Sequence, residues 1–201
     1  MQSEKKRQEK ARAIRKSIQM TVQPIRLALI VSNYYPGYSK MVEAARAEAA
    51  SNRAEVVFVC EVPGCFDMPL PIKALLQRDD VDAVVALGVI LPVPHKTMAG
   101  GSPRDEITTW DETIANGTIS RLDELALAFN KPVVKELIGP GFAVGMVKGH
   151  IEQYARAGVQ SALALVNELR RIRTSLSSQP GKDASQNVPE MPQSPDKRLA
   201  E

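Results

Sequence analysis

Two hydrophobic periodicities alternate along the middle of the chain. Short, almost continuous apolar runs, typical of strands buried on both faces, occupy residues 25–32, 54–60, 81–87 and 132–138. Segments with apolar residues at helical spacing occupy residues 41–50, 71–79, 114–129 and about 147–172. Strands that alternate with helices predict βαβ units and a parallel sheet whose right-handed crossovers place helices on both faces. We therefore predict an α/β fold.

This fold class indicates where chemistry should be sought. In open parallel sheets, ligands bind beyond the carboxyl ends of the strands. The segments that follow the four predicted strands are 32–37, 61–69, 88–106 and 136–150. The candidate functional residues are therefore sought in these four segments.

Composition divides the 201 residues into a domain and two flanking segments. Residues 1–20 are predicted to be a basic N-terminal extension, 21–173 the folded domain and 174–201 a disordered tail. Within residues 1–16, seven Lys and Arg residues face two Glu residues. Such an arm is either a solvated helical extension or a binding segment for nucleic acid or an acidic surface. Nucleic-acid binding is not assigned to it.

Other classes of protein are disfavoured. No apolar run approaches the roughly 20 residues that cross a bilayer, so no membrane association is expected. The two cysteines, Cys60 and Cys65, lie in a chain without a secretory signal pattern, which favours free thiols and a cytoplasmic location. His95 lies 30 residues beyond Cys65, so the ligands for a metal site are missing and none is predicted.

One motif carries a resemblance to a known family. Residues 62–70 read VPGCFDMPL and resemble the VPG-x-[FY]-[ED]-x-P motif of lumazine synthases. The run KALLQRDDVDAVV at 73–85 resembles the archaeal branch of that family, and so do Leu87-Gly88, ALAFNKPV at 126–133 and GPG at 139–141. These blocks follow one another in unbroken order over residues 25–172.

The resemblance implies a fold and an activity. It implies a three-layer α/β/α sandwich with a four-stranded parallel sheet in flavodoxin-like winding. It also implies homopentamers, in some members assembled into sixty-subunit shells, with active sites between neighbouring subunits. The family condenses 5-amino-6-(D-ribitylamino)uracil with 3,4-dihydroxy-2-butanone 4-phosphate by imine formation, loss of phosphate and ring closure. No cofactor takes part, and the expected ligands are small molecules.

Two segments match the family's pyrimidine and ribityl contacts. Tyr34 stands where the family carries an aromatic residue, on a turn that we expect to expose both Tyr34 and Tyr35. Its alternative role is an aromatic lid over the core. Cys65, Phe66 and Asp67 match the part of the VPG motif that holds the ribityl chain. Asp67 alternatively serves as the N-cap of the helix that follows.

The segment after the third strand departs from the family. Val89 and Ile90 match substrate-contacting positions, but residues 91–99 are inserted before the phosphate loop. In one register the loop resumes as Gly100, Gly101 and Ser102, whose backbone N–H groups suit phosphate, and Arg104 stands at the position of the family's proton-transferring histidine. In the other register His95 is that histidine, and the insertion follows it. Both His95 and Arg104 therefore remain catalytic candidates.

Two further departures lie downstream. The family's last helix carries a phosphate-gripping Arg near its start, and here Lys148 and His150 flank that position, as phosphate ligands or as surface residues. Arg156 lies close to where the family keeps a Lys. Lys135 and Glu136 interrupt the fourth strand and form either a functional pair beside a cleft or a simple ion pair at the subunit seam.

Three functions are consistent with this pattern. The leading prediction is a lumazine synthase, a transferase of riboflavin biosynthesis, with a remodelled phosphate loop. The second is a relative with changed chemistry, such as a riboflavin-synthase-like enzyme. The third is a non-enzymatic ligand-binding or assembly protein.

Overall fold

The computed structural model describes residues 23–90, 109–139 and 147–177. Four strands form one parallel sheet in the spatial order β2-β1-β3-β4, which is the flavodoxin-like winding predicted above. The strands are β1 (Arg26–Ser32), β2 (Glu55–Val62), β3 (Ala83–Val89) and β4 (Val133–Ile138).

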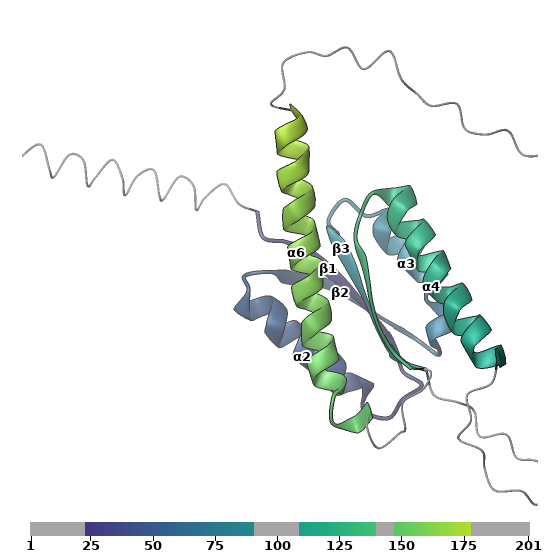
Figure 1. Ribbon diagram of the computed structural model, residues 1–201. Coiled ribbons are helices and arrows are strands. Elements are labelled where there is room, and N and C mark those ends of the chain that lie inside the picture. The colour runs from purple at the N-terminus through teal and green to yellow at the C-terminus, as the bar shows by residue number, and fades with distance from the viewer. Residues whose placement is uncertain (1–22, 91–108, 140–146, 178–201) are drawn as a thin grey trace, which may run out of the picture.

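Helices cover both faces of this sheet. They are α2 (Tyr38–Ser51), α3 (Pro69–Leu76), α4 (Thr109–Phe129) and α6 (Ile151–Ser177), and the short 3-10 helix η1 (Cys65–Asp67) precedes α3. In Figure 1, α2 and α6 lie on one side of the strands and α3 and α4 on the other. The predicted three-layer α/β/α sandwich is thus confirmed.

Alternating side chains of each strand build two separate cores. Along β1, Leu27, Leu29 and Val31 pack beneath α2 and α6, while Ala28 and Ile30 pack against α3 and α4. Burial on both faces is the reason that the strands read as continuous apolar runs rather than alternating ones. In the described part of the chain, no helix is long and apolar enough to cross a membrane.

Element ends differ from the predicted ones for local reasons. Helix α3 begins at Pro69, because proline is well suited to the first turn of a helix. Helix α6 continues to Ser177, so the prediction of a disordered tail from residue 174 is wrong for residues 174–177. There the Thr174 and Ser175 hydroxyls donate to the carbonyls of Arg170 and Ile172. Residues 1–20 and 178–201, the rest of the two predicted flanking segments, lie outside the described residues.

Candidate active site

The carboxyl ends of β1 and β2 present two exposed aromatic rings. The Asn33 N–H donates to the Val62 carbonyl at 2.9 Å, which holds the turn after β1 against the end of β2. Tyr34 on that turn is 60% exposed, and Phe66 in the loop after β2 is 47% exposed. Exposed aromatic side chains beyond adjacent strand ends offer surfaces on which a planar ligand can stack.

The second tyrosine of the turn behaves differently. Tyr35 is only 6% exposed and belongs to the core beneath α2 and α6, so the expectation that both tyrosines are exposed is wrong. The space beside Gly37 is bordered by the Tyr35 ring and by Ile151 of α6. The turn therefore directs one ring inward as an anchor and leaves Tyr34 outside, which disfavours the role of Tyr34 as a lid over the core.

The loop after β2 is closed by two hydrogen bonds between Gly64 and Asp67. The Gly64 N–H donates to Asp67 Oδ2 at 2.9 Å, and the Asp67 N–H donates to the Gly64 carbonyl at 3.1 Å. Asp67 does not cap α3, because the N-cap position of α3 belongs to Met68 and no side chain caps it. The alternative role as an N-cap is therefore wrong, and the carboxylate instead shapes the loop that exposes Phe66.

Cys65 anchors this loop to β3. Its buried thiol donates to the Val89 carbonyl at 3.9 Å, and burial raises its pKa from about 9 to about 11. A methyl group on Gly88 would lie 2.5 Å from Cys65 Sγ, so the absence of a side chain at Gly88 makes room for the thiol. Cys60 and Cys65 are both free, as predicted.

Val89 and Ile90 mark the end of β3. Both residues are buried, so within this subunit neither presents an open surface to a ligand. The Ile90 N–H donates to the Ile138 carbonyl at 2.8 Å. Gly139 has a φ of 106°, and a Cβ there would lie 2.1 Å from the Ile90 carbonyl oxygen, so only glycine fits. These contacts hold the carboxyl ends of β3 and β4 together.

The predicted phosphate loop and proton-transfer residues lie outside the described residues. They are His95, Gly100, Gly101, Ser102 and Arg104. Neither of the two registers is tested by the structure, and both remain predictions.

Lys135 and Glu136 do not form a pair and do not interrupt β4. Successive side chains of a strand point to opposite faces, so Lys135 lies toward α4, where it pairs with Asp123, and Glu136 lies toward Gly158 of α6. Half-burial raises the pKa of Glu136. The expectation of a mutual pair at a strand end is wrong, because β4 continues through both residues to Ile138.

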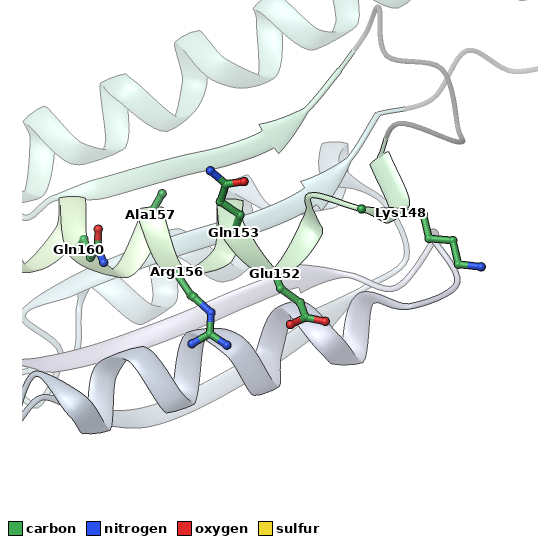
Figure 2. A pocket seen from close by; sticks show the side chains of 7 residues that line it. Lys148, Glu152, Gln153, Arg156, Ala157 and Gln160 are labelled. Carbon is green, nitrogen blue, oxygen red and sulfur yellow. The ribbon is translucent and has the colours of Figure 1, made fainter.

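A polar hollow with charges of both signs lies near the start of α6. A hollow of about 530 Å³ runs along the outer face of α6 and is lined by Lys148, Gly149, Glu152, Gln153, Arg156, Ala157 and Gln160. Figure 2 shows Glu152 and Arg156 projecting side by side, with Lys148 further toward the helix start. Arg156 approaches Glu48 of α2 at 3.8 Å, and Gln160 donates to the same carboxylate at 2.9 Å. His150 lies at the same end of α6, and its N–H donates to the Val147 carbonyl.

The residues of this hollow were only partly anticipated. The sequence pointed to Lys148 and noted Arg156, but not to Glu152, Gln153 or Gln160. Glu152, Arg156 and Gln160 recur every four residues in α6, a spacing that places them on one helix face and that could have identified these three. The hollow does not include Tyr34 or Phe66, so one subunit presents the aromatic surface and this polar hollow separately.

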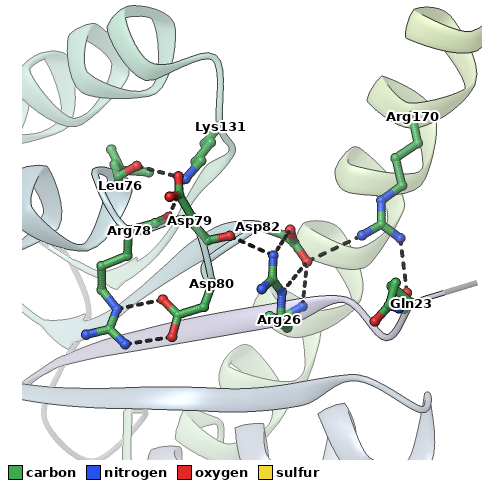
Figure 3. A network of polar contacts seen from close by, with 9 residues as sticks. All are labelled: Gln23, Arg26, Leu76, Arg78, Asp79, Asp80, Asp82, Lys131 and Arg170. Carbon is green, nitrogen blue, oxygen red and sulfur yellow. Dashed lines mark hydrogen bonds and ion pairs between the residues drawn. The ribbon is translucent and has the colours of Figure 1, made fainter.

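At the amino ends of the strands, the charged residues hold the fold together. Asp82, before β3, accepts hydrogen bonds from Arg26 at the start of β1 and from Arg170 of α6 (Figure 3). A small hollow of about 80 Å³ beside it is lined partly by Arg170 and Arg173. These cations are already engaged by protein oxygens. Among the described residues, no cluster of His, Cys, Asp or Glu is arranged to hold a metal ion.

Many protein families share this kind of parallel sheet, and comparison with known proteins shows to which of them the chain belongs. The family model described as 6,7-dimethyl-8-ribityllumazine synthase matches residues 24–171. The chain belongs to the 6,7-dimethyl-8-ribityllumazine synthase family. This confirms the resemblance inferred from the VPG motif, and the match spans all four strands and most of α6.

Individual relatives are similar over most of their length. The lumazine synthase of Saccharolobus islandicus is 37% identical over 154 residues, which are 76% of this chain and 92% of the relative. That of Metallosphaera sedula is 36% identical over 77% of this chain and 94% of the relative. That of Methanococcus maripaludis is 31% identical over 74% and 99%. These organisms agree with the predicted archaeal branch of the family.

Proposed function

We propose that this chain is a lumazine synthase, a transferase that condenses 5-amino-6-(D-ribitylamino)uracil with 3,4-dihydroxy-2-butanone 4-phosphate to form 6,7-dimethyl-8-ribityllumazine in riboflavin biosynthesis. The observation that carries this proposal is the family match over residues 24–171. The exposed aromatic surface and the closed Gly64–Asp67 loop at the carboxyl edge support it. No observation favours a riboflavin-synthase-like or a non-enzymatic alternative.

The carboxyl edge would hold the pyrimidine substrate. The Tyr34 ring, assisted by Phe66, would stack on the pyrimidine. Asp67 Oδ2 is occupied by the Gly64 N–H, whereas Oδ1 has no partner among the described residues and can accept a ribityl hydroxyl. The backbone of Cys65, which its buried thiol holds in place, would supply further hydrogen bonds to the ribityl chain.

The phosphorylated substrate would meet positive charge. We assign phosphate contacts to Lys148 and His150 and to the backbone of Gly100, Gly101 and Ser102, and a contact beside the reacting groups to Lys135. His95 or Arg104 would act where the proton moves or the phosphate leaves. Much of the catalysis would come from holding two reactive molecules together, an effect of about 7–11 kcal/mol in well-oriented systems.

The quaternary structure follows from the same proposal. We propose a homopentamer, with a sixty-subunit shell as its larger form, in a cytoplasmic setting. Strand β4 lies at one edge of the sheet, and its half-buried Glu136 has no partner among the described residues. A neighbouring subunit at this edge would cover β4 and bring Lys135 close to another subunit's site.

The proposal is tested by following lumazine absorbance after the two substrates are mixed with the protein. We expect a protein-dependent rate, and at least a tenfold lower kcat/KM for Tyr34→Ala and for Asp67→Ala, because stacking and polyol binding are lost. Asp80→Ala is the matched control. Asp80 is an equally charged, exposed residue, but it lies at the amino ends of the strands, away from the candidate site. A rate no faster than the protein-free reaction would assign this fold to another chemistry or to ligand binding.

A further inference from the structure

Ser32 is a buried polar residue that the proposed function does not use. It is the last residue of β1 and is 1% exposed. In the part of the chain that the structure describes, the buried polar residues are Ser32 and Thr118, the latter on α4. Removing a hydroxyl from water is unfavourable unless it forms hydrogen bonds, so the partners of Ser32 indicate why it is there.

The hydroxyl of Ser32 joins the two loops that carry the candidate substrate contacts. Its Oγ donates to the Pro63 carbonyl in the loop after β2 at 3.4 Å. The same Oγ accepts the Tyr34 N–H from the turn after β1 at 3.4 Å. One buried atom therefore contacts segments from both sides of the site.

The strand itself does not need this hydroxyl. The five residues before Ser32 in β1 are buried and apolar, and they alternate between the two cores. An alanine at position 32 would suit such a strand end as well, whereas it would leave the Tyr34 N–H and the Pro63 carbonyl without this partner. The hydroxyl thus serves the loops rather than the sheet.

We propose that Ser32 is a positioning residue of the lumazine synthase site, which fixes the Tyr34 ring relative to the loop of residues 63–67. The inference rests on the proposed function, because it assigns substrate contacts to both loops. Ser32 would act through the Tyr34 backbone and would not touch the substrate. Its effect should therefore be seen in pyrimidine binding and should depend on the presence of the Tyr34 ring.

A double-mutant cycle on the full chain tests this dependence. We expect Ser32→Ala to raise the KM for 5-amino-6-(D-ribitylamino)uracil about fivefold, the scale of one lost hydrogen bond, with little change in kcat. In a Tyr34→Ala background the same substitution should change KM less than about twofold, because the ring that it positions is absent. An equal factor in both backgrounds would overturn the proposal.

Thr118→Val is the matched control, since it also removes one buried hydroxyl with little change in volume. It should leave the KM for the pyrimidine unchanged in both backgrounds. A similar rise in KM would mean that any buried hydroxyl deletion weakens binding, which would also contradict a specific role for Ser32.

A second substitution applies if Ser32→Ala does not fold. Ser32→Cys keeps a weaker donor and acceptor of similar size and should give a KM between those of the wild type and Ser32→Ala. A wild-type KM would contradict the proposal.

A second measurement does not require activity. Amide hydrogen exchange at Tyr34 should be at least fivefold faster in Ser32→Ala than in the wild type, while amides within α2 exchange at unchanged rates. Unchanged exchange at Tyr34 would refute the positioning role even if the protein is an active enzyme. Faster exchange in a protein without lumazine-forming activity would support the positioning role while the proposed function fails.

Discussion

The contact between Gly88 and Cys65 shows how one missing side chain shapes the candidate site. Gly88 lies in β3, opposite Leu137 of β4, and the Cys65 thiol and the Met68 side chain occupy the space where its Cβ would be. The loop after β2 can therefore lie directly on the sheet. Because packed interiors tolerate little added volume, this position should be sensitive to a single methyl group.

We expect Gly88→Ala to lower the free energy of unfolding by about 1–3 kcal/mol, because the new methyl group overlaps Cys65 Sγ. Cys65→Ala in the same chain should restore most of that loss by removing the sulfur. Gly117→Ala, in α4, is the control: no atom lies within 4 Å of its Cβ position, and alanine favours a helix. Denaturant unfolding of the variants measures the effect, and a double variant no more stable than Gly88→Ala would contradict this account.

At the scale of elements, Asp82 joins two strands and a helix. Arg26 donates to it from β1 through its backbone N–H at 2.8 Å and through its guanidinium, and Arg170 donates from α6 at 3.3 Å. Partial burial alone would raise the pKa of Asp82, but the hydrogen bonds and charges of the two arginines outweigh it and hold the pKa below its ordinary value. The ionised carboxylate therefore stabilises the junction of β1, β3 and α6.

Asp82→Asn should destabilise the protein by about 1–2 kcal/mol at pH 7, because two arginines then face each other without a counter-charge. Since the pKa of Asp82 is lower in the folded chain, its contribution is present above the carboxyl's ordinary pKa and is lost as the pH falls through the folded-state value. The stability difference between wild type and variant should therefore shrink below about pH 4. Thermal melts across pH check this.

Asp80→Asn is the matched control for this experiment. Asp80 pairs with Arg78 at 2.7 Å, but both side chains are well exposed. Exposed ion pairs contribute about 0–1 kcal/mol, so this variant should lie close to the wild type. Equal losses from Asp80→Asn and Asp82→Asn would show that the junction around Asp82 has no special role.

At the scale of the whole molecule, one folded unit contains every described strand and helix, and the family match ends near the last of them. Residues 24–171 match the family, whereas α6 continues to Ser177. The described core residues run from Ile25 to Val166, and none lies in the last two turns of α6. The segment beyond Ser177 is therefore predicted to be dispensable for folding.

A chain that ends at Ser177 should keep the melting temperature within about 2 °C of the full chain, because it retains every described core residue. Sedimentation should give about five times the monomer mass for both chains, in line with the proposed pentamer. For the full chain the monomer mass is 21.9 kDa. A lower oligomer or a markedly lower melting temperature for the shortened chain would assign residues 178–201 a role in assembly.

The sequence alone determined the fold class, the four strands and the family. Runs of apolar residues record burial on both faces, and a motif such as VPGCFD is contiguous, so both can be recognised without coordinates. It also directed attention to Tyr34 and to the loop of residues 65–67. These are local properties of the chain, which depend only on residues that are near one another in the sequence.

Only the tertiary structure decided which side chains meet. Packing between distant segments turns Tyr35 inward while Tyr34 stays outside. It also sets the bond of Asp67 to Gly64 and the pairing of Lys135 with Asp123. Ser32 appeared in the sequence only as the end of a strand. Its partners lie at positions 34 and 63, on loops that become neighbours only when parallel strands align their carboxyl ends, because register and face are set by the whole sheet.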